Sequence, residues 1–158
     1  MKALRSVSLA AVIAAALFTT PSRADIGAGV TDTIIRIGNT NPYSGPASSY
    51  GTIGRTMAAY FDKVNDEGGI GGRKLEFITY ADAYSPPKTV EQTRRLVGRD
   101  DVLLIVQALG TATNTAVREY LNAKKVPQLF VSSGATKWGD PENYPWTMGW
   151  HPNYQSEA

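Results

Sequence analysis

Apolar residues recur along this chain in two alternating patterns. Short runs, either continuous or alternating, predict strands, and longer stretches with apolar residues three and four positions apart predict helices. The predicted strands are Thr33–Gly38, Lys74–Tyr80, Val102–Val106 and Val126–Val131, with Trp146–Trp150 as a candidate fifth. The predicted helices are Ser49–Glu67, Lys88–Gly98 and Thr113–Ala123.

The helix predicted first has the clearest boundaries. It follows the loop around Ser44-Gly45-Pro46 and should end at Gly68-Gly69, since glycine tolerates the left-handed conformation of a helix end. Its apolar residues fall on one face that we expect to be dry: Tyr50, Ile53, Met57, Phe61 and Val64.

Strands and helices alternate across short connections, which predicts an α/β fold with a parallel, doubly wound sheet of the Rossmann type. The continuous apolar run Val102–Val106 suits a strand covered on both faces. Open sheets of this kind hold ligands at the carboxyl ends of their strands, so the loops there are the place to look for a site.

The first 24 residues have the features of a secretory signal peptide. Lys2 and Arg5 precede an unbroken apolar run, Val7–Phe18, and Ser22 and Ala24 form a small-x-small cleavage pattern. The run is too short for a membrane span. We therefore expect cleavage after Ala24, release into a periplasm, and one lobe over residues 25–158.

Composition changes once the leader is removed. Three of the 16 basic residues leave with it, so 13 face 14 acidic residues, a net charge of −1. No basic stripe remains to indicate a nucleic-acid partner. Cysteine is absent, which excludes a disulfide framework and a lipid-linked cysteine.

Motifs for catalysis and for cofactor binding are missing from the sequence. His151 is the only histidine, and there is no G-x-S-x-G elbow, no cluster with metal-ligand spacing, and neither G-x-G-x-x-G nor a P-loop. We expect no enzyme, no metal and no cofactor. A nucleotide-type fold without nucleotide fingerprints favours binding over catalysis.

Two predicted loops carry groups suited to an anion. Gln107–Thr111 opens a helix, whose free N–H groups and dipole attract a carboxylate beside the Thr111 hydroxyl. Ser132–Thr136 adds the Thr136 hydroxyl, and its small residues Gly134 and Ala135 allow a close backbone approach.

Tyr50 would supply an aromatic wall from a third loop, so the three loops predict a small pocket. Each feature also has a purely structural reading. Thr111 and Ser48 suit plain helix N-caps, Tyr50 suits the core, and Ser132-Ser133-Gly134 suits an ordinary turn. Convergence of the loops at one edge of the sheet favours the pocket.

Four segments together resemble a known family. They are Ser44-Gly45-Pro46-Ala47 with Tyr50-Gly51, then Asn65 to Leu75, then Tyr80-Ala81-Asp82-Ala83, and Gly134-Ala135-Thr136 after Val131-Ser132. The sequence resembles the leucine/isoleucine/valine-binding family of type I periplasmic substrate-binding proteins, which feed ABC importers. The resemblance covers residues 33 to 157.

This resemblance implies two α/β lobes that close on a ligand by a hinge, of which the chain matches the first. It implies that Tyr50 contacts the ligand side chain, and that Thr111 and Thr136, with the backbone at Gly134 and Ala135, hold its carboxylate. A membrane permease would be the partner. The acidic residue for the ligand ammonium would come from the second lobe, so we expect this chain to be a piece of a longer one; a complete small domain is the alternative.

Two departures from the family pattern bear on function. Some members join the positions matching Tyr84 and Gly110 by a disulfide, and both cysteines are missing here. Trp138 follows the loop Ser132–Thr136 and would either enlarge an aromatic lining, favouring an aromatic carboxylate as ligand, or anchor a long loop. The remaining alternative function is the ligand-sensing domain of a receptor or regulator.

Overall fold

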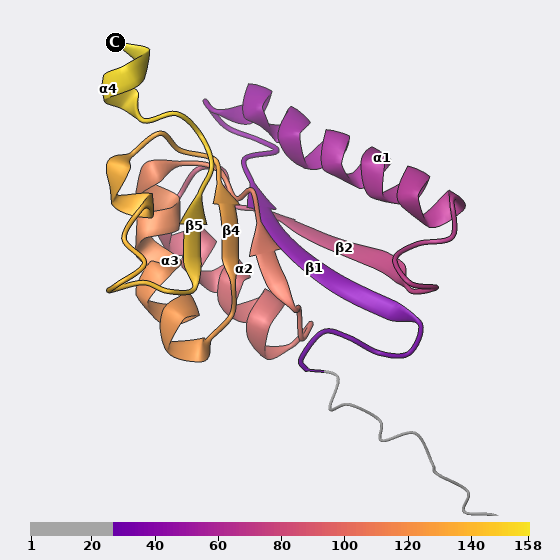
Figure 1. Ribbon diagram of the computed structural model, residues 1–158. Helices are drawn as coiled ribbons and strands as arrows, with labels where there is room; N and C mark the ends of the chain where they lie inside the picture. The colour runs from indigo at the N-terminus through magenta and orange to yellow at the C-terminus, as the bar shows by residue number, and fades with distance from the viewer. Residues whose placement is uncertain (1–26) are drawn as a thin grey trace, which may run out of the picture.

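The computed structural model describes residues 27–158, which form one sheet with helices on both faces (Figure 1). The predicted signal peptide lies outside the described residues. All strand pairs are parallel and the sheet order is β2-β1-β3-β4-β5. The strands are β1 (Ile34–Asn41), β2 (Lys74–Ala81), β3 (Leu104–Val106), β4 (Gln128–Val131) and β5 (Thr147–Gly149).

Helices connect these strands in the predicted alternation. After β5 the chain enters a short final helix, α4 (Tyr154–Glu157). The others are α1 (Thr52–Asp66), α2 (Pro86–Gly98) and α3 (Thr111–Lys124), with 3-10 turns η1 (Ser48–Gly51) and η2 (Thr136–Trp138). The predicted doubly wound α/β fold is confirmed, and the strand order reverses between β1 and β3, where open sheets hold ligands.

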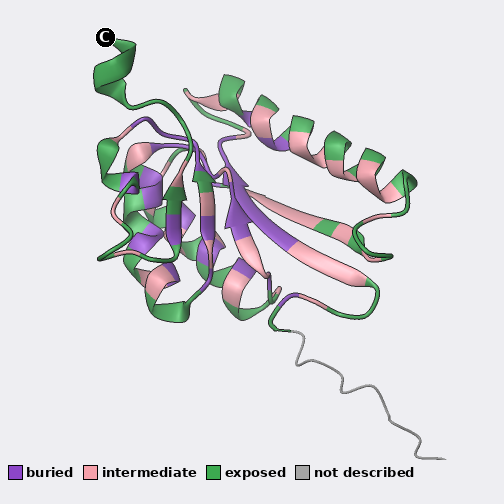
Figure 2. Cartoon of the chain, viewed as in Figure 1, coloured by how far each residue is buried: buried purple, intermediate pink, exposed green. Residues whose placement is uncertain are grey.

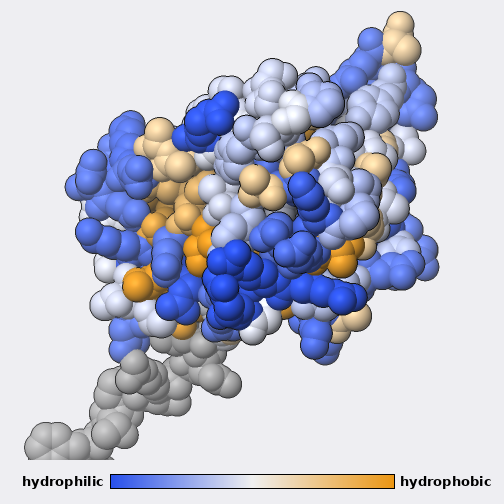
Figure 3. Space-filling view, turned by 180° about the vertical axis from the view of Figure 1, so that it is seen from behind, coloured by the Kyte–Doolittle hydropathy of each residue, from blue (hydrophilic) through white to orange (hydrophobic). Residues whose placement is uncertain are grey.

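The main core lies between the sheet and the helix pair α2 and α3, which share one face while α1 covers the other (Figure 1). Its buried residues are Leu96, Val102, Ile105, Ala108, Val117, Leu121 and Val126. Figure 2 shows the buried residues gathered along the middle of the sheet and the inner sides of these helices. Seen from behind, the surface of the molecule is mostly hydrophilic, with apolar residues in limited areas (Figure 3).

The apolar stripe of α1 differs from the prediction at its first member. Ile53, Met57, Phe61 and Val64 are half-buried as expected, but Tyr50 is 56% exposed. Tyr50 belongs to η1, ahead of α1. Tyr43 takes the inner position instead: a Cβ on Gly54 would collide with its phenol oxygen, which hydrogen-bonds the Thr79 hydroxyl at 2.6 Å.

The first strand ends three residues later than predicted because its polar end is buried and pairs with β2 through the backbone. Asn39, Thr40 and Asn41 are at most 1% exposed. The Asn39 amide donates to the Val106 carbonyl at 2.7 Å, and the Thr79 hydroxyl donates to the Asn39 side-chain oxygen at 2.9 Å. Polar residues therefore carry β1 up to the edge where the candidate site lies.

The predicted helix boundaries rest on glycine and proline. Gly68 (φ 105°) and Gly69 (φ 74°) follow α1, and their N–H groups donate to the carbonyls of Asn65 and Val64. Pro86 and Pro87 occupy the first two positions of α2, where no hydrogen bond is lost. The predicted end of α1 at Gly68-Gly69 is confirmed, and α2 begins two residues before the predicted Lys88.

Candidate ligand-binding site

A hollow of about 310 Å³ lies at the carboxyl edge of the sheet, beside the reversal between β1 and β3. We call it the tyrosine hollow, because three of the residues lining it are Tyr50, Tyr84 and Tyr154. The remaining lining residues are Ala47, Ile53, Leu109, Gly110, Ser132, Ser133, Gly134, His151 and Glu157. Aromatic and aliphatic surface thus faces two glycine-containing loops.

Three hydroxyl groups meet at the border of this hollow. Thr111 Oγ1 and Ser133 Oγ are 2.6 Å apart, and the Tyr154 hydroxyl lies 3.4 Å from each of them. Thr111 is the first residue of α3, so this hydroxyl cluster stands at the positive end of a 14-residue helix. The arrangement concentrates O–H donors where a helix favours negative charge.

The start of α3 has no side-chain cap. Its N-cap is Gly110, with φ at 101°, and no side-chain cap hydrogen bond is formed there. The alternative that Thr111 is a plain N-cap is therefore wrong, because its hydroxyl bonds Ser133 instead. The proposal that Ser48 caps a helix is wrong too, since Ala47 is the N-cap of η1 and no side-chain cap bond is present.

A buried polar residue fixes the loop before α3. The Asn114 amide donates to the carbonyls of Ala108 and Gly110 at 2.8 and 2.7 Å, and its oxygen accepts from Gln128 at 2.9 Å. Gln128 in turn accepts from the Thr147 hydroxyl of β5 at 3.2 Å. Loop carbonyls are thereby turned inward and tied to two strands.

Each of the two loops lies under a tyrosine ring. A Cβ added to Gly110 would come within 2.3 Å of the Tyr84 ring, and one added to Gly134 within 2.6 Å of the Tyr154 ring. The Tyr154 backbone N–H also donates to the Gly134 carbonyl at 2.8 Å. Glycine at these two positions allows the rings to lie on the backbone.

Hydrogen bonding changes the acidity of one of these tyrosines. The Ser133 hydroxyl, and next the Thr111 hydroxyl, lower the pKa of Tyr154 below the ordinary value for a phenol, and the Gly134 backbone adds to the effect. Partial burial and the nearby Glu157 carboxylate oppose it. A negatively charged oxygen is therefore favoured at this position.

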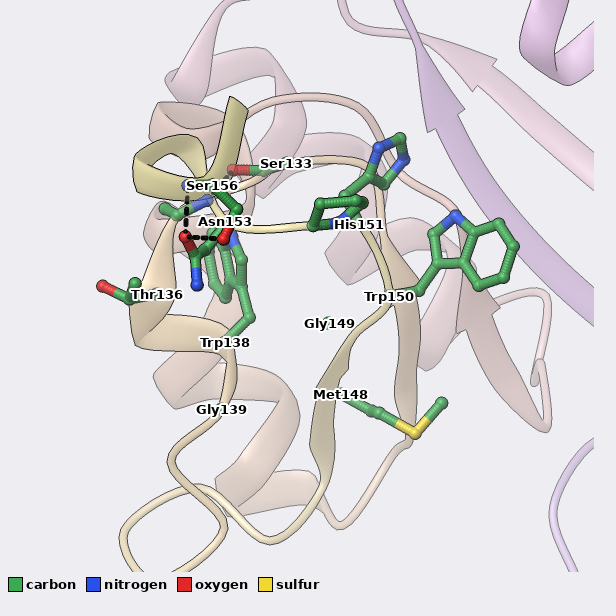
Figure 4. Close-up of a pocket in the computed structure, with 12 residues that line it drawn as sticks. Ser133, Thr136, Trp138, Gly139, Met148, Gly149, Trp150, His151, Asn153 and Ser156 are labelled. Carbon is green, nitrogen blue, oxygen red and sulfur yellow. Dashed lines mark hydrogen bonds between the residues drawn. The ribbon is translucent and has the colours of Figure 1, made fainter. Parts of the chain in front are cut away.

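A second hollow, of about 480 Å³, is lined by residues from 133–139 and 148–156, which Figure 4 shows as sticks. We call it the tryptophan hollow, because Trp138 and Trp150 line it. Its other lining residues are Ser133, Ala135, Thr136, Gly139, Met148, Gly149, His151, Pro152, Asn153 and Ser156. Ser133 and His151 border both hollows.

Trp138 is only 3% exposed, and its surroundings are those of a loop anchor. The Arg118 guanidinium lies 5.7 Å from the Trp138 ring centroid and donates to the Lys137 carbonyl at 3.0 Å. Arg118 also pairs with Asp140 at 3.4 Å. These contacts organise the loop that follows η2.

The six residues predicted to contact ligand are divided between the two hollows. Tyr50 and Gly134 line the tyrosine hollow, and Thr111 borders it through the hydroxyl cluster. The tryptophan hollow takes the other three: Ala135, Thr136 and Trp138. Thr136 is exposed at its rim.

The sequence analysis did not single out Ser133, Tyr84 or Tyr154 as site residues. Ser133 belongs to the predicted loop Ser132–Thr136, so the sequence did offer its hydroxyl as a candidate. Tyr84 and Tyr154 reach the hollow because their rings lie on glycines that are distant in sequence. The local spacing of residues does not predict such contacts.

Within residues 27–158, no group of three or more histidine, cysteine, aspartate or glutamate side chains is placed to hold a metal ion. No helix in this same range has the length and apolar character that crossing a membrane requires.

The fold and hollow define a doubly wound α/β lobe with a ligand-type crevice at its strand reversal. A family model described as periplasmic binding protein matches residues 34–158. The chain belongs to that family, as the resemblance implied.

Individual proteins that this chain is similar to belong to the same class. The leucine-, isoleucine-, valine-, threonine- and alanine-binding protein of Pseudomonas aeruginosa is 29% identical over 87 residues, which are 54% of this chain and 23% of the relative. A possible leucine/isoleucine/valine-binding protein of Rhodopirellula baltica superposes with a TM-score of 0.72 at 24% identity, over 79% of this chain and 33% of the relative.

A branched-chain amino acid transporter substrate-binding protein of Streptococcus pneumoniae, solved with isoleucine, gives a TM-score of 0.57 at 25% identity, over 61% of this chain and 28% of the relative. These proteins are solute-binding proteins. The chain thus spans about a quarter to a third of the length of the relatives it matches.

Proposed function

We propose that this chain is the first lobe of an exported solute-binding protein. It captures an amino acid of the branched-chain type, or a related small carboxylate, and delivers it to the membrane permease of an ABC importer. The observation that supports this best is the hydroxyl pair Thr111 and Ser133, 2.6 Å apart at the start of α3 and beside the tyrosine hollow.

The chemistry of this pair suits a carboxylate. Hydroxyls and free backbone N–H groups donate to an anion, and the dipole of α3 adds a favourable field at its N-terminus. Gly134 and Ala135 belong to the adjacent loop, whose backbone comes close to the ligand in this proposal. Thr136 donates from the rim of the tryptophan hollow.

The rest of the tyrosine hollow suits a short apolar side chain. Tyr50 and Tyr84 present exposed rings, 56% and 40%, with Ile53 and Leu109 beside them. A ligand ammonium needs an acidic partner, which we assign to a second lobe that closes over the hollow. Binding and release by closure require no catalytic group, so the proposed protein is not an enzyme.

An aromatic carboxylate is the second candidate ligand. Three tyrosines around a volume of about 310 Å³ offer stacking surfaces for a ring as readily as contacts for a branched side chain. Trp138 is no part of this argument, because its ring is buried beneath the other hollow.

Export follows from the predicted leader. We propose that residues 1–24 direct the chain to the periplasm and are removed after Ala24. N-terminal sequencing of the protein recovered from a periplasmic fraction tests this: a mature chain beginning at Asp25 supports export, and a cytoplasmic chain that begins at Met1 contradicts it.

Ligand capture is tested by calorimetry on the protein expressed from the complete reading frame. The panel contains leucine, isoleucine, valine and alanine, with benzoate and 4-hydroxybenzoate as aromatic carboxylates. Micromolar or tighter binding of any of these supports the proposal, and its preference decides between the two ligand classes. Binding of none of them contradicts the proposed function.

A further inference from the structure

The Tyr154 hydroxyl makes only long contacts with the other two hydroxyls of the cluster. Its contacts with Thr111 and Ser133 are 3.4 Å long, whereas strong O–H···O bonds are about 2.7–2.8 Å. The bond between Thr111 and Ser133, at 2.6 Å, is by contrast fully formed. The Tyr154 phenol therefore has a donor hydrogen available to a third partner.

The position of the phenol is fixed even though half of the side chain is exposed. Its ring lies on Gly134, where even a Cβ would come within 2.6 Å of ring carbon Cδ1. Its backbone N–H donates to the Gly134 carbonyl at 2.8 Å. The hydroxyl is thus held at the edge of the loop while 51% of the residue faces solvent.

We propose that Tyr154 is a ligand contact that selects for the carboxylate. Its hydroxyl holds one carboxylate oxygen of the bound ligand, together with whichever hydroxyl of the Thr111–Ser133 pair does not donate within the pair. This inference rests on the proposed function and adds to it a hydroxyl donor on a segment distant in sequence from Thr111 and Ser133.

The acidity of the phenol is consistent with this role. Ser133 and Thr111 lower the pKa of Tyr154, so the place where its oxygen lies already favours an anion. When the phenol loses its proton it can no longer donate, and its charge repels a carboxylate. Carboxylate affinity should therefore fall as the pH rises through the pKa of Tyr154.

Other charged and titratable groups face Tyr154 from several elements. Tyr50 of η1 and Tyr84 of the loop before α2 line the same hollow, and His151 and Glu157 flank Tyr154 on its own segment. The first turn of α3 contributes no acidic residue. A pH profile must therefore be compared between variants rather than interpreted alone.

Tyr154→Phe is the decisive variant, because it keeps the ring on Gly134 and removes only the hydroxyl. Tyr60→Phe is the matched control: Tyr60 is also exposed, at 60%, but lies on α1 outside the tyrosine hollow. The probes are leucine with leucinamide and benzoate with benzamide, each pair differing in the replacement of the carboxylate by a neutral carboxamide.

Calorimetry on the protein from the complete reading frame should show the acid bound about tenfold more weakly by Tyr154→Phe, with the amide little changed. The wild-type affinity for benzoate should decline as the pH rises through the lowered pKa of Tyr154, while that of Tyr154→Phe stays flat over the same range. Tyr60→Phe should match wild type throughout.

Three outcomes contradict the inference. Equal losses for acid and amide indicate a structural role for Tyr154. A wild-type affinity in Tyr154→Phe, with an unchanged pH profile, shows that its hydroxyl does not touch the ligand, although the proposed function then stands. If the wild type binds no carboxylate at all, the proposed function fails and the inference fails with it.

Discussion

The ring of Tyr84 occupies the space that a side chain at Gly110 would need. A Cβ on Gly110 would come within 2.3 Å of Tyr84 Cε2, and Gly110 has a φ of 101°, which side-chain-bearing residues rarely adopt. The resemblance to the binding-protein family implies that some of its members join these two positions by a disulfide. Here an aromatic ring on a glycine joins the same two loops without a covalent bond.

Gly110→Ala should therefore destabilise the lobe by about 2–4 kcal/mol, through backbone strain at positive φ and the collision with Tyr84. Chemical denaturation followed by circular dichroism measures this loss. The same substitution should weaken carboxylate binding, because Gly110 is the N-cap of α3.

Gly98→Ala is the matched control. Gly98 ends α2, and an added Cβ there meets nothing within 4 Å. The change should be neutral or stabilise the fold by up to about 1 kcal/mol. If both glycine variants unfold at the wild-type midpoint, the packing of Tyr84 on Gly110 is not what holds these loops together.

Asn114 is the next position where one substitution should have a large effect. Asn114→Ala removes its hydrogen bonds to the carbonyls of Ala108 and Gly110, which keep other donors, and leaves the buried Gln128 amide nitrogen without its partner. We expect a loss of about 2–4 kcal/mol in the free energy of unfolding.

Asn143→Ala provides the comparison, since Asn143 is exposed and bonds only Asp140 among the described contacts. It should shift stability by no more than about 0.5 kcal/mol. A similarly small shift for Asn114→Ala would mean that the buried hydrogen bonds linking α3, β4 and β5 contribute little to the stability of the fold.

Tyr154 should ionise more readily than an ordinary tyrosine. Its folded pKa is lowered by Ser133 and Thr111, so the phenolate is the form that folding favours. The resulting stabilisation is present above the unfolded pKa and is lost as the pH falls through the folded pKa. The stability of wild type relative to Tyr154→Phe should therefore rise as the pH passes from the lowered pKa of folded Tyr154 up to about pH 10, the ordinary value for tyrosine, and stay constant at lower pH.

Carbon-13 labelling of the tyrosine ring next to the hydroxyl allows the ionisation to be followed directly by NMR. Ser133→Ala should move the Tyr154 pKa back toward its ordinary value, and Thr111→Val should do so to a smaller extent. A Tyr154 resonance that titrates identically in all three proteins would show that neither hydroxyl reaches the phenol.

Residues 25–158 alone should bind ligand weakly or not at all. The tyrosine hollow is open to solvent, since the rings of Tyr50 and Tyr84 in its lining are 56% and 40% exposed. The proposed acidic partner of the ligand ammonium lies in a second lobe. Calorimetry with leucine measures this. Nanomolar to low-micromolar binding by this lobe alone would refute the need for a second wall.

The alternation of strands and helices was predictable because it depends on local apolar spacing, glycine at helix ends and proline at a helix start. The end of β1 was not, since Asn39 is a polar residue whose burial depends on partners in other strands, and Asn41 donates to Asn39. Tyr50 was placed on the buried stripe of α1 because its spacing fits. Tyr43 occupies the inner position, which sequence spacing does not reveal.

The candidate site was predictable to the extent that it follows from topology. Loops after β3 and β4 had to meet at one edge, and Thr111 is found there next to Ser133. The separation of Trp138 and Thr136 into a second hollow depends on how the loop after η2 packs on Arg118. Contacts between such distant segments leave no mark in local sequence.

The most direct test of the central claim is the effect of Thr111→Val on carboxylate affinity in the protein from the complete reading frame. Valine keeps the shape of threonine and removes the hydroxyl that meets Ser133 at the start of α3. We predict a loss of about 1–3 kcal/mol in binding free energy for the preferred ligand of the panel, with the unfolding midpoint little changed. An unchanged affinity in Thr111→Val would contradict the assignment of the carboxylate to this end of α3.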